Sequence, residues 1–207
     1  MDASQHLPLH PGAVIAYSGI SPAPWRNGGG VTRQIASGKL DVAGSLESVP
    51  GDDWDWRLSI ADVESEGPFS SFAGMTRILT ILEGEGLAIT IDGVARRLGR
   101  YTPLRFDGGA TTSATLPAGP IRDFNLITRT GTVYGQVDLV ELSPEHPRKL
   151  AAGQLGVLLQ GRARLQDGDA GERSLERYDT VVGGGEPSPA ISGSGLLAVV
   201  SLEPGSA

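Results

Sequence analysis

Short runs of alternating hydrophobic and polar residues recur along the whole chain, and no long run repeats every 3.6 residues. Alternation with a period of two is typical of strands that bury one face, so the pattern predicts an all-β fold. The predicted strands span residues 31–35, 56–63, 75–83, 87–91, 112–116, 123–128, 133–142, 156–165, 178–183 and 195–202.

Glycine and proline mark the turns between these runs. The chain has 30 glycines and 14 prolines, which leaves little room for helices. Asp92-Gly93 stands between two alternating runs and predicts a type I′ hairpin, because both residues tolerate the positive φ that this turn needs. Residues 39–53 are polar and interrupted by glycine and proline, so we expect a loop or a poorly formed edge strand there.

A segment with two prolines at residues 143–149 predicts a connector between two halves of the chain. After it the strand pattern restarts, and the run at 156–165 echoes the run at 78–87. Duplication of a small β-barrel unit explains this echo, and chance similarity between two hairpins is the alternative. We therefore expect an N-terminal barrel at 1–142, which carries the ligand pocket, and a smaller C-terminal barrel at 143–207, which N-terminal strands could complete.

Composition and charge narrow the classes of function. With no cysteine, the chain has no disulfide, no thiolate nucleophile and no sulfur-ligated metal. A net charge of -7 argues against binding to nucleic acid or an anionic membrane, which need a basic surface; it reflects either simple solubility or a dedicated partner. The N-terminus does not resemble a secretory signal and no apolar run approaches about 18 residues, so we expect a cytoplasmic protein.

The segment at residues 24–33, Pro-Trp-Arg-Asn-Gly-Gly-Gly-Val-Thr-Arg, concentrates candidate binding groups. Three consecutive glycines lose much backbone entropy on folding, which indicates a conformation or a close approach that side chains forbid. Amide, hydroxyl and guanidinium groups around them suit a small anionic or amide-bearing ligand. The candidates are Asn27, Gly28, Gly29, Gly30, Thr32 and Arg33. A purely structural glycine bulge at a barrel corner is the alternative, and the segment matches neither a P-loop nor a dinucleotide-binding motif.

Alternation within residues 55–61 places Arg57 and Ser59 on one face of a strand and apolar side chains on the other. If the face of Arg57 points into the barrel, it offers a carboxylate donor and a hydroxyl to a ligand. A solvated outer face with Arg57 in a surface ion pair is the alternative. Further candidates are Phe69, Ser70, Phe72, Arg77 and Asn125. Each has a structural alternative: the phenylalanines could plug a barrel end, the arginine could be an edge charge, and the serine and asparagine could satisfy backbone groups.

Five motifs over residues 24–129 resemble the HutD/Ves family of double-cupin proteins, whereas the C-terminal half matches it only in general pattern. The first is the glycine-rich segment described above. The others are Asp-Trp-Arg-Leu-Ser-Ile-Ala at 55–61, Gly-Pro-Phe-Ser-Ser-Phe at 67–72, Leu-Glu-Gly-Glu-Gly at 82–86 and Gly-Pro-Ile-Arg-Asp-Phe-Asn at 119–125. The resemblance implies a bicupin, two jelly-roll-like barrels packed together. Through its association with histidine-utilisation operons, it also implies control of that pathway by a small acid such as N-formylglutamate.

One departure concerns metals. Metal-dependent cupins present histidines and a glutamate inside the barrel, but the equivalent stretch here has no histidine. The three histidines are His6, His10 and His146; Pro8 disfavours a helix that would pair the first two, and surface positions are the simpler interpretation. We therefore expect no metal and no other cofactor.

Three functions follow as hypotheses. The leading one is a non-metal protein that binds and senses a small carboxylate or a formyl- or amide-bearing metabolite, with no catalytic residue assigned. The second is a metal-free enzyme, an isomerase or hydrolase of such acids, in which Asp or Glu would supply acid–base catalysis. The third is an interaction module whose exposed barrel edges mediate oligomerisation, for example as a homodimer.

Overall fold

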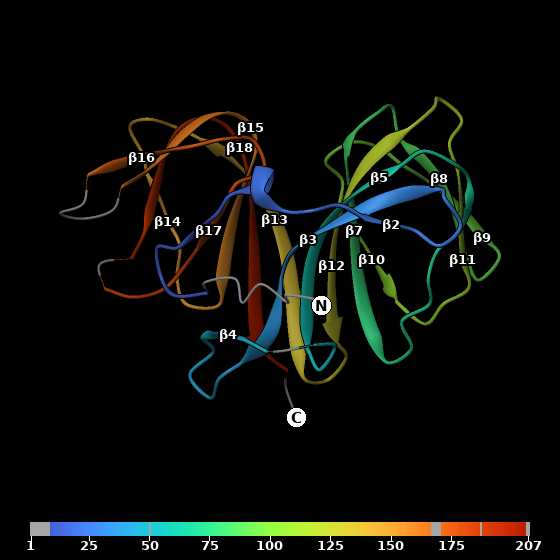
Figure 1. Cartoon of the computed structure of the whole chain (residues 1–207), viewed down its shortest axis with the longest axis horizontal. Coiled ribbons are helices and arrows are strands. Elements are labelled where there is room, and N and C mark those ends of the chain that lie inside the picture. The colour runs from blue at the N-terminus through green and yellow to red at the C-terminus, as the bar shows by residue number, and fades with distance from the viewer. Residues whose placement is uncertain (1–8, 50, 167–170, 187, 206–207) are drawn as a thin grey trace.

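Strands make up most of the protein and are paired into three sheets (Figure 1). The computed structural model describes residues 9–49, 51–166, 171–186 and 188–205. Within these residues the only helical element is a 3-10 turn, η1, at Tyr17–Gly19. The predicted all-β fold is therefore confirmed, and each predicted strand overlaps an observed one.

Sheet A has seven strands in the order β1-β17-β15-β18-β13, with β14 paired to β18 and β16 to β15. All of its pairs are antiparallel. Its strands are β1 (Val14–Ile15), β13 (Val133–Leu142), β14 (Arg148–Lys149), β15 (Gln154–Gln166), β16 (Glu172–Leu175), β17 (Thr180–Val182) and β18 (Ala190–Pro204).

Sheets B and C form the other lobe. Sheet B runs β10-β7-β12-β5-β3-β2, with β4 paired to β3, and sheet C runs β6-β11-β8-β9. Sheet B contains β2 (Ala23–Pro24), β3 (Gly30–Leu40), β4 (Leu46–Ser48), β5 (Trp56–Val63), β7 (Met75–Glu83), β10 (Leu104–Asp107) and β12 (Ile121–Arg129). Sheet C contains β6 (Gly67–Pro68), β8 (Leu87–Ile91), β9 (Val94–Leu98) and β11 (Thr112–Thr115). Hydrogen bonds do not close these sheets into continuous barrels.

Sheet B lies between the other two sheets, so both of its faces are buried. Leu58 of β5 belongs to an apolar cluster that also holds Leu155 and Val200 of sheet A. Ala61, on the opposite face of the same strand, belongs to a second apolar cluster that also holds Ile89 of sheet C. The Leu58 face of β5 therefore packs between the two lobes, while the Ala61 face lines the interior of the N-terminal lobe.

The change from one lobe to the other does not coincide with residue 142. β13 was expected in the N-terminal barrel, but it pairs with β18 over its whole length, from Val133 opposite Pro204 to Leu142 opposite Gly195. The predicted connector at 143–149 consequently joins strands of sheet A and contains β14. β1, from the N-terminus, pairs with β17 in the same sheet. An alternating strand fits either sheet, so its period alone does not select its partner.

Two local predictions have clear outcomes. Asp92 and Gly93 have φ values of 46° and 80°, as a type I′ turn between β8 and β9 requires. In the polar segment that begins at Lys39, β3 continues to Leu40 and the three-residue β4 folds back on it, which agrees with the expected loop or short edge strand. The carboxylate of Asp41 stabilises that turn by accepting hydrogen bonds from two backbone N–H groups.

Within the described residues, no helix is both long enough and apolar enough to cross a membrane.

Candidate functional site

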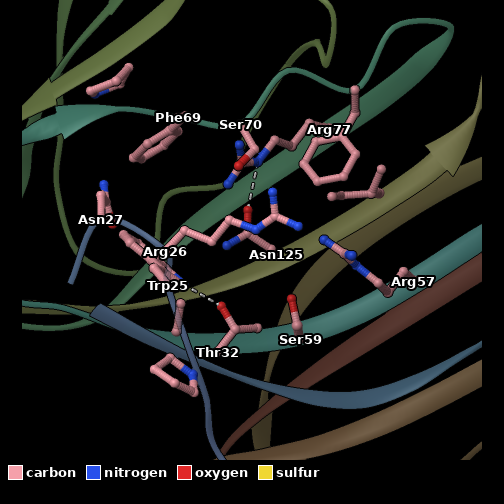
Figure 2. A pocket seen from close by; sticks show the side chains of 15 residues that line it. Trp25, Arg26, Asn27, Thr32, Arg57, Ser59, Phe69, Ser70, Arg77 and Asn125 are labelled. Carbon is pink, nitrogen blue, oxygen red and sulfur yellow. Dashed lines mark hydrogen bonds between the residues drawn. The ribbon is translucent and has the colours of Figure 1, made fainter. Parts of the chain in front are cut away.

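A cavity of about 420 Å³ hollows the inward face of sheet B (Figure 2). This volume suits a small molecule, because ligand cavities usually measure about 300–1,000 Å³. Its walls come from β3, β5, β7 and β12, from the segment before β3 and from the loop after β6. The lining residues are Pro24, Trp25, Arg26, Asn27, Thr32, Arg57, Ser59, Ala61, Pro68, Phe69, Ser70, Phe72, Arg77, Asn125 and Ile127.

The period of two brings the polar lining together from neighbouring strands. Arg57 and Ser59 lie two residues apart on β5 and therefore share a face. Across the sheet, Ser59 is opposite Asn125 of β12, and Arg57 is opposite Ile127. The inward orientation was one of two alternatives for the Arg57 face, and it is the one that the structure adopts.

Arg77 and Asn125 form a buried hydrogen-bonded pair at the back of the cavity. The Nε of Arg77 donates to Oδ1 of Asn125 at 2.7 Å, and Nδ2 of Asn125 donates to Oδ1 of Asp123. Asp123 is 1% exposed and does not line the cavity. The two hydrogen bonds fix the orientation of the Asn125 amide, because a rotated amide would place its N–H groups against the donor of Arg77.

Arg57 is held by aromatic rings instead of hydrogen bonds. Its Cζ lies 5.0 Å from the ring centroid of Trp54 and 5.0 Å from that of Phe72, within the range of cation–π interactions. Its Nε is buried and has no hydrogen-bond partner within the described residues. A buried N–H without an acceptor is costly, so this guanidinium is a ready donor for a bound anion.

Burial perturbs the charged groups of the site in different directions. It lowers the pKa of Arg57, and it lowers that of Arg77 to about 10, where the positive charge of Arg57 adds to the effect and Asp123 opposes it. Both arginines remain cationic at neutral pH. Burial also raises the pKa of Asp123 to about 7, despite the attraction of Arg77.

The loop after β6 supplies an aromatic wall. Phe69 stacks on the guanidinium of Arg77, whose Cζ is 4.6 Å from the ring centroid, much as Phe72 stacks on Arg57. Both rings line the cavity, together with the exposed Ser70. Two phenylalanines in a Gly-Pro loop are thus explained by packing against the buried Arg77 and the half-buried Arg57.

The glycines shape the segment next to the cavity but do not line it. Gly28 has a φ of 71°, and the N–H of Gly29 donates to Oδ1 of Asn27 at 3.1 Å. A Cβ on Gly30 would lie 2.3 Å from the carbonyl oxygen of Asp62, so glycine is needed for the close approach of β3 to β5. The structural interpretation therefore accounts for Gly28 and Gly30, and none of the three glycines is part of the lining.

Arg33 is the other expected site residue that lies away from the cavity. It follows Thr32 on β3 and so points to the opposite face of the sheet. There it donates to Oδ2 of Asp62 at 2.9 Å and packs over the ring of Tyr17. Thr32 does line the cavity, and its Oγ1 accepts a hydrogen bond from Nε1 of Trp25 at 2.8 Å.

Six lining residues were not among the expected site residues: Pro24, Trp25, Arg26, Ala61, Pro68 and Ile127. The same period of two that identified Ser59 and Asn125 also reaches Ala61 and Ile127. Figure 2 shows the side chain of Arg26 reaching across the cavity toward Asn125, so the site has a third guanidinium. In the sequence, the position of Arg26 within the glycine-rich segment indicated that it could belong to the site.

A metal ion does not fit this lining. Its side-chain groups are guanidinium, amide, hydroxyl and aromatic groups, and the described lining contains neither histidine nor carboxylate. His10 and His146 are exposed and lie outside the cavity lining, and His6 falls outside the described residues. Across the described part of the chain, no three His, Cys, Asp or Glu side chains gather as a metal site would require.

Curated proteins from bacteria resemble parts of this chain. It is 45% identical over 105 residues to an uncharacterized 21.2 kDa protein in the hutC 3′ region of Pseudomonas putida, which covers 50% of this chain and 51% of that protein. It is 36% identical over 119 residues to protein Ves of Citrobacter koseri, which covers 56% and 58%. The chain therefore matches little more than half the length of these relatives.

Solved structures agree with the fold over nearly the whole chain. HutD from Pseudomonas fluorescens SBW25, in a formate condition, has a TM-score of 0.73 at 27% identity, covering 94% of this chain and 99% of that one. A cupin 2 conserved barrel domain protein from Leptotrichia buccalis has a TM-score of 0.56 at 10% identity, covering 96% and 99%, which confirms the cupin fold. Because a family model described as HutD matches residues 17–198, the chain belongs to the HutD family.

Proposed function

We propose that this protein binds a small carboxylate metabolite, such as N-formylglutamate, in the cavity of its N-terminal lobe, and that it regulates histidine utilisation in the cytoplasm through this binding. The observation that supports it most is Arg57, a half-buried arginine at the cavity whose buried Nε has no acceptor within the described residues. A carboxylate would supply that acceptor and neutralise a charge that burial disfavours.

The rest of the lining suits the same ligand. None of the seven ion pairs found among the described residues involves Arg26, Arg57 or Arg77, so their charges are available to an anion. The hydroxyl of Ser59 lies on the same face of β5 as Arg57, opposite Asn125 of β12, and would contact a formyl or amide oxygen. The relative named for the hutC 3′ region supports a role in histidine utilisation.

An enzyme acting on such an acid is the alternative expected from the sequence. General acid–base catalysis needs a titratable side chain within hydrogen-bond reach of the substrate. The described lining offers no Asp, Glu or His, and Asp123 is separated from the cavity by Asn125. Binding therefore fits the geometry better than turnover does.

Isothermal titration calorimetry with N-formyl-L-glutamate, urocanate and formate tests the proposal. We expect saturable binding of at least one acid, and a loss of at least tenfold in affinity on Arg57→Ala, because one charge-assisted contact contributes on the order of 1.5–3 kcal/mol. Arg97→Ala is the matched control, since Arg97 is exposed on β9. Absence of binding by all three acids would refute the proposal, and product formation detected by NMR would favour the enzyme.

A further inference from the structure

The acceptors and the donors of the cavity wall differ in how many already have a hydrogen-bond partner within the protein. Its amide and threonine oxygens already accept hydrogen bonds from the protein. Oδ1 of Asn27 accepts from the N–H of Gly29, Oγ1 of Thr32 from Trp25, and Oδ1 of Asn125 from Nε of Arg77. Each of these three oxygens therefore already uses one of its two lone pairs within the protein before any ligand arrives.

Most of the arginine N–H donors of the wall, in contrast, have no hydrogen-bond partner within the described residues. The buried Nε of Arg57 has no hydrogen-bond partner among the described residues, and Arg77 donates to Asn125 through its Nε, which leaves its two terminal nitrogens. Thr32 accepts from Trp25, so its own hydroxyl proton is directed elsewhere. A ligand in this cavity meets N–H and O–H groups on most sides.

All charged side chains of the described lining are positive. Arg26, Arg57 and Arg77 contribute three guanidinium groups, and the described lining contains no carboxylate. The carboxyl of Asp123 is held behind Asn125, whose Nδ2 donates to it. Even a fully ionised Asp123 would leave at least two positive charges uncompensated at the cavity.

An ammonium group would be destabilised in such surroundings. It carries three N–H donors and no acceptor, so it needs oxygen acceptors in exchange for the water it loses. The cavity offers few of these, and three guanidinium groups would repel the charge. A ligand nitrogen that is acylated carries no charge and adds a carbonyl oxygen, which the donors of the wall can contact.

We infer that this cavity selects carboxylates that carry no ammonium group, and so distinguishes an N-acylated or deaminated acid from the corresponding free α-amino acid. The inference rests on the proposed function and adds a rule for the ligand. Oxygens that already accept from the protein, and arginines with no ion-pair partner among the described residues, make the wall a donor surface, which accepts anions and rejects zwitterions.

Two matched pairs of probes test this rule by calorimetry at pH 7.5. The first pair is N-formyl-L-glutamate and L-glutamate, and the second is urocanate and L-histidine. In each pair whose first member binds, we expect the amino acid to bind at least tenfold more weakly. An amino acid within tenfold of its partner overturns the inference but leaves the proposed function standing. Absence of binding by all four probes overturns the inference, and the proposed function falls with it when formate does not bind either.

Substitution of Ser59 provides a second, independent measurement. Ser59→Asp places a carboxylate opposite Asn125 in the wall, so it should weaken the first member of each pair and narrow the ratio to its amino acid. Ser59→Asn is the matched control, because it has the size of aspartate and removes the hydroxyl equally but adds no charge, so it should retain more of the ratio than Ser59→Asp. An unchanged ratio in a folded Ser59→Asp variant, verified by circular dichroism, contradicts the electrostatic origin of the selectivity.

Discussion

The phenol of Tyr178 donates a hydrogen bond to Oε1 of Glu83 at 2.5 Å and thereby joins the two lobes. Tyr178 lies between β16 and β17 of sheet A, and Glu83 ends β7 of sheet B. The same oxygen of Glu83 pairs with Arg122 at 2.8 Å and with Arg177 at 3.0 Å. Burial opposes ionisation of Glu83, but the hydrogen bond from Tyr178 and the two arginine charges outweigh it and lower its pKa.

The first prediction concerns this contact between the lobes. Tyr178→Phe should lower the free energy of unfolding by about 1–3 kcal/mol, because it removes a hydrogen bond to a charged acceptor and leaves the ring in place. Chemical denaturation monitored by circular dichroism measures the change. Tyr134→Phe is the control, since Tyr134 is 51% exposed, and it should change stability little. Equal effects of the two variants would contradict the role of the phenol.

A second prediction separates the glycines of the glycine-rich segment. Gly30→Ala should destabilise the fold by more than about 2 kcal/mol, because its Cβ would lie 2.3 Å from a backbone oxygen of β5. Gly28→Ala should cost about 1–2 kcal/mol, since its φ is 71° but the space around it is open. Thermal denaturation of both variants tests the order; a less stable Gly28→Ala would show that backbone conformation outweighs the close approach.

A third prediction concerns Arg33, which an alternating strand places behind the cavity wall. Arg33→Ala should change carboxylate affinity by less than about threefold, because its guanidinium binds Asp62 and not the cavity. It should lower stability by about 1 kcal/mol, as expected for a partly exposed ion pair. Calorimetry and denaturation measure the two quantities separately. A loss of affinity equal to that of Arg57→Ala would return Arg33 to the site.

The fourth prediction follows from the buried carboxyl of Asp123, which accepts a hydrogen bond from Asn125 and is affected by the charges of Arg77 on β7 and Asp62 on β5. Burial raises its pKa from 3.8 to about 7. A raised pKa in the folded state means that folding takes up a proton between those values, so stability falls as pH rises from about 4 to about 7.

Asp123→Asn removes the titrating group while keeping an oxygen that accepts from Asn125. We expect the free energy of unfolding to vary less between pH 5 and pH 8 in this variant than in the wild type. Urea denaturation at several pH values measures the difference. Asp138→Asn removes one charge from an exposed position and should retain the pH dependence of the wild type. A pH profile unchanged by Asp123→Asn would show that this carboxyl does not titrate in the range.

The pattern of side chains along the strands predicted much of the candidate site. Alternation placed Arg57 and Ser59 on one face, and nine of the thirteen expected ligand-binding residues line the cavity. The exceptions have physical reasons. Arg33 and Thr32 are neighbours in β3 and cannot share a face, while the glycines contribute close backbone packing and no side chain.

By itself, the sequence determined the class of fold, the strands and the turn at Asp92-Gly93, because period-two alternation and positive φ are local properties of the chain. The pairing of β13 with β18, the position of Asp123 behind Asn125, and the lack of an acceptor for Nε of Arg57 among the described residues follow only from the three-dimensional arrangement. These features depend on which strands meet and which groups water can reach. Such contacts join residues far apart in the chain, so no local pattern specifies them.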